Sequence, residues 1–370
     1  MNSENHGESA SPFLTSIGWD ERVSADFAEH FDNGLKPGRV ARVDRISSLI
    51  LTDAGSVRAE PSTEMMLTSK TEHLPAVGDW VGLLPRPRHD TDSIEVVLPR
   101  RSTLARTRGG SDSRSAISKT QVIAVNVDFV FATHTAVKTN TARLAREVAQ
   151  IEQSGSTPVA LLTKSDLVAD PSAVLDRIEK TTPGLRVHLT SSLTGDGVNE
   201  LRQYLTGNRT VVFIGASGVG KSTLSNQLLG NEVLATRDVR EFDGKGKQTT
   251  TARHLLPIPG GGVLIDTPGM RTFTLQGAEE GLEKAFSDIN DLAEECGFRD
   301  CRHGSEPGCA VQAAIRGGDL TTQRFESFLK LGGEIRHERS KSDKASYAEE
   351  RARLRGRTKY YKKNIKQRER

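Results

Sequence analysis

The sequence predicts a multidomain α/β protein with an N-terminal OB-type β-barrel, a central sheet covered by helices, and a C-terminal helical domain that carries a metal site. Three observations lead to this fold class. Short alternating strands separated by turns occupy residues 36–104, as in small β-barrels. Strand and helix patterns then alternate through residues 105–275, which indicates a mostly parallel sheet with helices on both faces. All three cysteines fall within residues 296–309, after the last predicted strand.

These patterns divide the chain into five segments. We expect a flexible N-terminal segment at 1–35, the barrel at 36–104, the central sheet domain at 105–275, the metal-binding domain at 276–340 and a basic tail at 341–370. Within the first segment, residues 1–33 are expected to be poorly ordered or weakly helical. Residues 102–121 are rich in Arg, Ser and Gly. We therefore expect a mobile connector there.

Charge and hydropathy restrict the protein classes to consider. Lys and Arg number 51 against 48 Asp and Glu, so the net charge of +3 carries little information. The tail is different, because residues 351–370 hold ten Lys or Arg and a single acid, Glu369. Such a segment is attracted to phosphate backbones, although a solvated tail without a specific partner is an equal alternative.

The expected location is the cytoplasm. The sequence has no apolar run of the length that a membrane helix requires. The polar N-terminus shows no secretory signal pattern, so we expect neither a membrane partner nor export. With only three cysteines, a disulfide framework is also disfavoured.

A phosphate-binding loop follows the predicted strand TVVFI at 210–214. The pattern G-x-x-x-x-G-K-[ST] precedes a predicted helix, the context in which successive backbone N–H groups face a bound phosphate. Lys221 is expected to reach the β- and γ-phosphates, and Ser222 to coordinate Mg²⁺. The predicted phosphate-contacting residues are Gly215, Ala216, Ser217, Gly218, Val219, Gly220, Lys221, Ser222 and Thr223.

The choice of base depends on the motif Thr163, Lys164, Ser165 and Asp166, which follows the strand PVALL. It resembles the [NT]-K-x-D guanine motif of GTPases. The Asp166 carboxylate can accept hydrogen bonds from N1–H and from the exocyclic amine of guanine, whereas adenine offers no such pair of donors. The pattern K-x-D alone is weak, because average composition yields about one per chain of this size. Ser191 and Ser192, after the strand RVHL, resemble the loop that backs the guanine.

The remaining nucleotide motifs come late in the chain. Asp266 and Gly269 form a D-x-x-G pattern after the strand GGVLI, with Asp266 expected near Mg²⁺ and the Gly269 amide near the γ-phosphate. The loop at 244–251 contains Thr249 and Thr250, either of which is expected to bind Mg²⁺. Ordinary GTPases place the phosphate loop first and the guanine motif later. Here the order is reversed, which predicts a circularly permuted P-loop GTPase domain.

The cysteines predict a structural zinc site. Cys296, Cys301, His303 and Cys309 provide three thiolates and one imidazole, a ligand set that suits tetrahedral Zn²⁺ without an open position. Three buried thiols beside a surface histidine are the alternative.

The combined order of these modules resembles the ribosome small subunit-dependent GTPase A (RsgA/YjeQ) family. The resemblance covers roughly residues 38–340 and includes VGDWV at 77–81, LPRRSTLART at 98–107 and QVIAVNVDFVF at 121–131. It implies a monomeric GTPase that converts GTP to GDP, is stimulated by the small ribosomal subunit and acts late in the maturation of that subunit. It also implies that the barrel and the zinc domain contact rRNA.

Two residues depart from the GTPase pattern. Met270 follows the D-x-x-G motif, where Ras-like proteins carry the glutamine that orients the attacking water. Gln248 stands where members of the resembled family usually carry a histidine in the switch loop. We expect Gln248 and Lys221 to be the catalytic residues, with Gln248 positioning the water.

The alternatives are a non-hydrolysing, nucleotide-gated rRNA-binding module, a P-loop ATPase or kinase, and a permuted GTPase of the large ribosomal subunit.

Overall fold

The structure is a computed structural model that describes residues 11–44, 47–69, 73–108, 119–230, 253–267, 285–298, 301–304 and 306–333. Its contacts define two compact units. One comprises Met1–Ala105 and Val122–Phe273, and the other comprises Arg106–Gln121 and Thr274–Arg370. The predicted barrel and sheet domains therefore belong to one unit. Within the described residues, no helix is long and apolar enough to cross a membrane.

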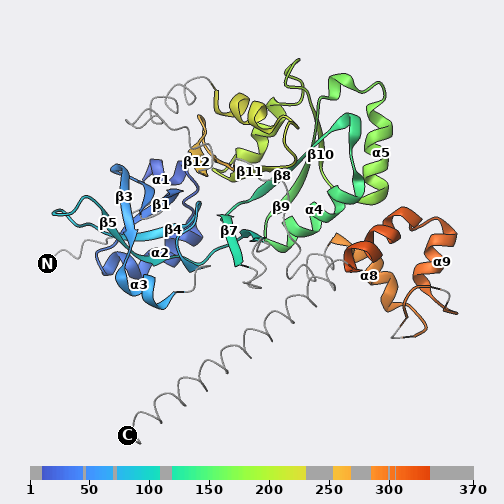
Figure 1. The fold of residues 1–370 in the computed structure, drawn as a ribbon, viewed down its shortest axis with the longest axis horizontal. Coiled ribbons are helices and arrows are strands. Elements are labelled where there is room, and N and C mark those ends of the chain that lie inside the picture. The colour runs from blue at the N-terminus through green and yellow to red at the C-terminus, as the bar shows by residue number, and fades with distance from the viewer. Residues whose placement is uncertain are drawn as a thin grey trace, which may run out of the picture. The chain divides into compact units, whose positions relative to one another are not determined.

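The barrel is closed and has the connectivity of an OB fold, as predicted. Its strands are β1 (Lys36–Val43), β2 (Ser48–Thr52), β3 (Gly55–Pro61), β4 (Trp80–Leu84) and β5 (Asp92–Val97), in the order β1-β2-β3-β5-β4 (Figure 1). The short helix α3 (Thr63–Thr68) connects β3 to β4. β3 and β5 are parallel and the other neighbours are antiparallel. Alternate side chains such as Val40, Ile50 and Ile94 fill the interior.

The N-terminal segment is helical from residue 12, which corrects the expectation of a flexible segment through residue 35. Helices α1 (Pro12–Ser16) and α2 (Glu21–Asp32) begin at Ser11 and Asp20, whose side chains accept from Leu14 N–H and Val23 N–H. Both are regular N-caps. Leu14, Trp19 and Phe27 are buried, so these helices contribute to the core.

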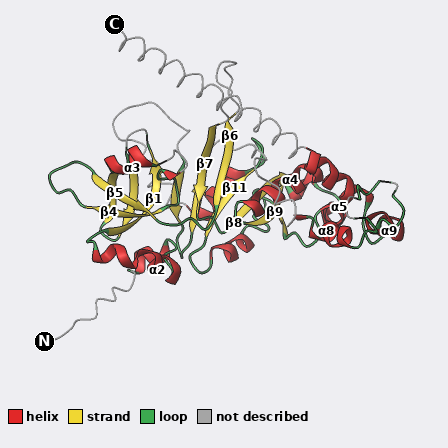
Figure 2. Ribbon diagram, turned by 90° about the horizontal axis from the view of Figure 1, so that it is seen from below, coloured by secondary structure: helices red, strands yellow, loops and turns green. Residues whose placement is uncertain are grey.

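The segment expected to be a mobile connector begins and ends in strands, which is a second correction. β6 (Thr103–Arg108) and β7 (Lys119–Val125) form a two-stranded sheet (Figure 2). Leu104 and Ile123 are each 1 % exposed and belong to the main hydrophobic core. Apolar side chains at these positions order both ends of the polar segment.

The central sheet has six strands in the order β10-β9-β8-β11-β13-β12. The strands are β8 (Phe129–Thr135), β9 (Thr157–Thr163), β10 (Val187–Thr190), β11 (Thr210–Ile214), β12 (His254–Pro257) and β13 (Val263–Asp266). All neighbours are parallel except β12 and β13. The first strand in the sequence, β8, lies at the centre between β9 and β11. This connectivity is that of a permuted sheet, and it brings the ends of β9 and β11 to the same edge.

Helices cover both faces of this sheet. α4 (Thr141–Gln153) and α5 (Pro171–Thr181) pack on the face that carries Val130 and Ala132. The 3₁₀ helix η4 (Asn199–Leu205) and the helix at 221–230 pack on the face that carries Phe129 and Phe131. Successive residues of β8 therefore serve opposite layers, as the two-residue period of a strand requires.

The C-terminal part of the second unit, from Thr274 onward, is helical where it is described. α8 (Ser287–Glu294), α9 (Ala310–Gly317) and the helical residues 322–333 surround the cysteine cluster. Arg324 holds the helix at 322–333 to α8 through Asp288, with donor–acceptor distances of 3.0 and 2.7 Å. Its guanidinium also lies over the ring of Phe286, 4.2 Å from the ring centre. A charged pair and an aromatic contact together stabilise this small core.

Candidate functional site

The phosphate loop lies between β11 and the helix at 221–230, as the sequence predicts. Gly215 has a φ of 143°, and a Cβ atom there would lie 2.3 Å from the carbonyl oxygen of Thr133. Only glycine lets the loop leave the strand this close to β8. Lys221 donates from Nζ to the carbonyl oxygens of Gly215 and Ala216, each at 2.8 Å. The ammonium group is therefore held inside the loop.

A cavity of about 340 Å³ adjoins this loop. Asp266, at the end of β13, lies on its wall together with Thr267. The cavity is polar and places a carboxylate beside the lysine and the serine of the loop, the arrangement that a magnesium–phosphate group requires. The lining residues include Ser217, Gly218, Gly220, Lys221, Ser222, Thr223, Ser225, Asp266 and Thr267.

The guanine motif is joined to the phosphate loop by Thr163. Its hydroxyl donates to the carbonyl oxygen of Val219 at 2.6 Å, and the carbonyl oxygen of His134 lies 3.1 Å away. Lys164 follows with a φ of 59°, in the left-handed region that lysine seldom occupies. This turn ends β9 abruptly and begins η3 (Ser165–Leu167), which contains Asp166.

Asp166 is exposed, and its orientation is set by Ser191. The Ser191 hydroxyl donates to Asp166 Oδ1 at 2.6 Å, while its oxygen accepts from the N–H groups of Leu193 and Thr194 at 3.3 Å each. A hydroxyl has one hydrogen and two lone pairs, so Ser191 is fully used. Asp166 therefore presents an oriented acceptor group at the same sheet edge as the phosphate loop.

Gln227 is a residue that the sequence analysis missed. It lies on the helix after the phosphate loop, and its Nε2 donates to the carbonyl oxygen of Ser192 at 3.1 Å. This bond joins the phosphate-loop helix to the guanine-backing loop. Its position about two turns into an ordinary amphipathic helix gave no sequence signal.

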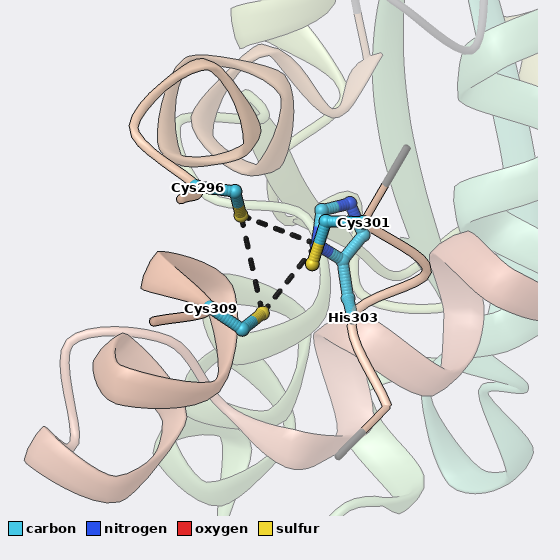
Figure 3. Close-up of side chains that lie close together, drawn as sticks. All are labelled: Cys296, Cys301, His303 and Cys309. Carbon is cyan, nitrogen blue, oxygen red and sulfur yellow. Dashed lines mark hydrogen bonds between the residues drawn. The ribbon is translucent and has the colours of Figure 1, made fainter. Parts of the chain in front are cut away.

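The four predicted metal ligands converge in the C-terminal unit (Figure 3). Their ligand atoms all lie within 4.8 Å of one another. Cys296 Sγ lies 3.9 Å from Cys309 Sγ, and His303 Nδ1 lies 3.5 and 3.6 Å from these two sulfurs. Tetrahedral Zn²⁺ bonds of about 2.3 Å to sulfur and 2.0–2.1 Å to nitrogen would place the ligand atoms about 3.6–3.8 Å apart. The geometry thus fits zinc.

The protonation of the cluster also favours a cation. Burial opposes ionisation of Cys296, but hydrogen bonds from the N–H groups of Ala310 and Val311 and from the Cys301 and Cys309 thiols together lower its pKa. The His303 N–H acts to lower the pKa of Cys301, but desolvation and the adjacent sulfurs raise it to about 11. Ionisation of the Cys301 thiol at neutral pH therefore needs a nearby positive charge.

The loop around His303 is braced by side chains outside the ligand set. Gln312 donates from Nε2 to the carbonyl oxygen of His303 at 2.7 Å, and His303 itself has a φ of 57°. The Glu306 carboxylate accepts from Arg302 N–H and Gly304 N–H at 3.1 and 2.7 Å. These contacts orient the imidazole toward the sulfurs.

Four predicted site residues lie outside the described residues. They are Gln248, Thr249, Thr250 and Gly269. Their roles stay predictions.

The strand order, the phosphate loop and the guanine-type loop define a circularly permuted P-loop GTPase. A sequence model of the family described as RsgA GTPase matches residues 97–276. The small ribosomal subunit biogenesis GTPase RsgA of Streptomyces coelicolor is 42% identical over 342 residues, which cover 91% of this chain and 90% of that protein. The protein of that name from Methanosarcina acetivorans is 38% identical over 349 residues, with 92% of each chain covered. The chain belongs to the RsgA family of GTPases.

Solved structures agree with this fold. YloQ, described as a circularly permuted GTPase, aligns with a TM-score of 0.59 at 25% identity and covers 82% of this chain and 96% of its own. YjeQ from Thermotoga maritima aligns with a TM-score of 0.60 at 24% identity, over 81% of this chain and 98% of its own.

Proposed function

We propose that this chain binds the small ribosomal subunit late in its maturation and hydrolyses GTP to GDP and phosphate at a rate that the subunit stimulates. The observation that carries the proposal is the oriented carboxylate of Asp166 at the same sheet edge as Lys221 and Ser222. The names of the relatives support the choice of partner. A cytoplasmic location follows from that partner.

In this proposal each group of site residues has a separate role. Lys221 neutralises the β- and γ-phosphates, and Ser222 and Asp266 hold Mg²⁺, with Thr249 or Thr250 as a further ligand. Asp166 selects guanine. One structural zinc ion is held by Cys296, Cys301, His303 and Cys309. It would stabilise a C-terminal surface for rRNA, and the barrel would provide a second rRNA-binding surface.

The test is steady-state hydrolysis of GTP and ATP, with and without purified small subunits. We expect slow GTP turnover alone and an increase of at least about tenfold with small subunits, because a partner that orders a switch loop completes the site. Large subunits are the control and should have no effect. GTP binding without hydrolysis under every condition would instead support the non-hydrolysing rRNA-binding alternative, which Met270 favours.

Gln248→Ala tests the proposed water-positioning residue. We expect subunit-stimulated kcat to fall by about 10–100-fold with little change in KM, because the side chain would act on the water and not on the bound nucleotide. Gln248→His should retain turnover, since imidazole can also orient water. Gln203→Ala, an exposed glutamine on η4, is the matched control. Undiminished stimulation in Gln248→Ala would remove the assignment.

A further inference from the structure

Arg39 lies at the centre of the junction between the barrel and the central sheet. It is a residue of β1, yet only 1 % of it is exposed. Its guanidinium donates to acceptors from four separate segments of the same compact unit. These are the carbonyl oxygens of Ile17, Gly78 and Asn126 and the hydroxyl of Thr210. The bonds to Gly78 and Asn126 measure 3.3 Å, and the bond to Thr210 measures 2.8 Å.

The charge of Arg39 is buried without an ion-pair partner among the described residues. Burial lowers the pKa of Arg39 to about 10, and the carboxylates of Asp128 and Asp79 act in the opposite direction. The guanidinium thus remains charged at neutral pH. Asp79 is itself occupied, because Arg100 donates to both of its oxygens at 2.8 Å. Burying a charge without an ion-pair partner costs folding free energy. The role of Arg39 is therefore better explained by the arrangement of the four segments that it holds together than by a gain in the stability of the fold.

The residues around Arg39 bring the backbones of the barrel and of the sheet domain close together. The guanidinium lies over the ring of Trp80, 5.2 Å from its centre. Gly78 has a φ of 100°, and a Cβ atom there would lie 2.2 Å from the carbonyl oxygen of Val125. The barrel and the sheet domain therefore meet backbone to backbone at this glycine, as also shown by the bond from Val125 N–H to the Val77 carbonyl at 3.0 Å.

Thr210 connects this junction to the nucleotide site. Arg39 holds its hydroxyl, while Asp128 Oδ2 accepts from its backbone N–H at 2.7 Å. Thr210 is the first residue of β11, and the last residue of that strand, Ile214, precedes the phosphate loop. At about 3.3 Å per residue, a strand of this length is short and extended, so it connects the position fixed by Arg39 directly to the phosphate loop.

We propose that Arg39 is a positioning residue that fixes the barrel to the amino end of β11, so that a ligand bound to the barrel acts on the phosphate loop through this strand. Its predicted effect on stimulation by small subunits rests on the proposed function. Its effect on β11 does not.

Thr210→Val is the principal variant, because it removes one acceptor of Arg39 and keeps the shape of the side chain. Hydrogen exchange, measured on the free protein, should become about tenfold faster in residues 210–214. Affinity for GDP should stay within about twofold, since the phosphate-binding groups are untouched. Stimulation of GTP hydrolysis by small subunits should fall at least about fivefold.

Arg39→Met and the double variant provide the second arm. Arg39→Met should accelerate exchange in the same residues at least as much. Addition of Thr210→Val should have no further effect there, because Arg39→Met has already broken the Arg39–Thr210 hydrogen bond. Thr52→Val is the matched control, since Thr52 is a buried barrel threonine whose hydroxyl donates to the Gly55 carbonyl away from the junction. It should leave exchange in 210–214 unchanged.

Two results would overturn the proposal. Unchanged exchange in 210–214 of Thr210→Val would mean that the contact does not fix β11. Faster exchange together with full stimulation would mean that the strand does not carry the signal. If the wild-type protein itself shows no stimulation, the proposed function fails, while the exchange experiment still decides whether Arg39 fixes β11.

Discussion

Cys309→Ser should leave the purified protein with almost no bound zinc and should unfold the C-terminal unit. Cys309 is 3% exposed, its sulfur accepts from Gln312 N–H at 3.4 Å at the start of α9, and it belongs to the four-ligand cluster. The single substitution thus removes a metal ligand and also weakens the N-cap of α9. Structural zinc contributes about 10–16 kcal/mol of apparent binding free energy in small zinc domains, far more than a small helical core provides alone.

The measurement combines metal analysis with limited proteolysis. Wild-type protein should contain about one zinc ion per chain. In Cys309→Ser, cleavage within residues 285–333 should become rapid, whereas GDP binding should persist because the nucleotide site belongs to the other compact unit. Ser327→Ala, at a half-buried residue of the same unit outside the ligand set, is the control. Zinc retained at one per chain in Cys309→Ser would show that the ligand set is different.

Asp166→Asn should weaken GTP binding by about 10²–10⁴-fold. The carboxylate is proposed to accept two hydrogen bonds from guanine, each worth about 1.5–3 kcal/mol when one partner is charged. An amide replaces one acceptor with a donor and so opposes the exocyclic amine. Xanthine carries a carbonyl at that position, so Asp166→Asn should bind xanthosine triphosphate better than the wild type does.

Competition between GTP, ATP and xanthosine triphosphate for a fluorescent GDP analogue gives the measurement. Asp170→Asn is the matched control, because Asp170 is a nearby N-cap whose function asparagine preserves. Ser191→Ala should cause a smaller loss, about tenfold, because it frees the orientation of Asp166 without changing its charge. Equal GTP affinity in Asp166→Asn and wild type would remove Asp166 from the guanine site.

The sequence predicted those features whose signal is local. The phosphate loop and the cysteine cluster are short motifs in which spacing determines geometry, and the structure places each between the elements expected. The N-terminal helices were expected only as a flexible, at most weakly helical segment, although the signal for regular helices was present. Asp20 precedes Glu21, and Val23 and Phe27 are four residues apart, which is the pattern of a capped amphipathic helix.

Other features had no local signal. Arg39 and Thr210 are separated by 171 positions, and neither belongs to a sequence motif that would predict their contact. Nothing in an arginine within an alternating strand predicts burial, because arginine on a strand is usually exposed. Gln227 likewise has its role only after the sheet brings its helix beside Ser192. Such contacts follow from tertiary packing and not from residue patterns.

The permuted strand order also has a consequence for synthesis on the ribosome. β8 takes the central place in the sheet, but its neighbour β11 begins about 80 residues later in the chain. A nascent chain therefore exposes one apolar edge of β8, and leaves the Arg39 guanidinium without its acceptor on Thr210, until residues 210–214 emerge. Such long-range pairing slows folding and leaves surfaces open to aggregation. We expect newly made protein to depend on chaperones during that interval, before any nucleotide can bind.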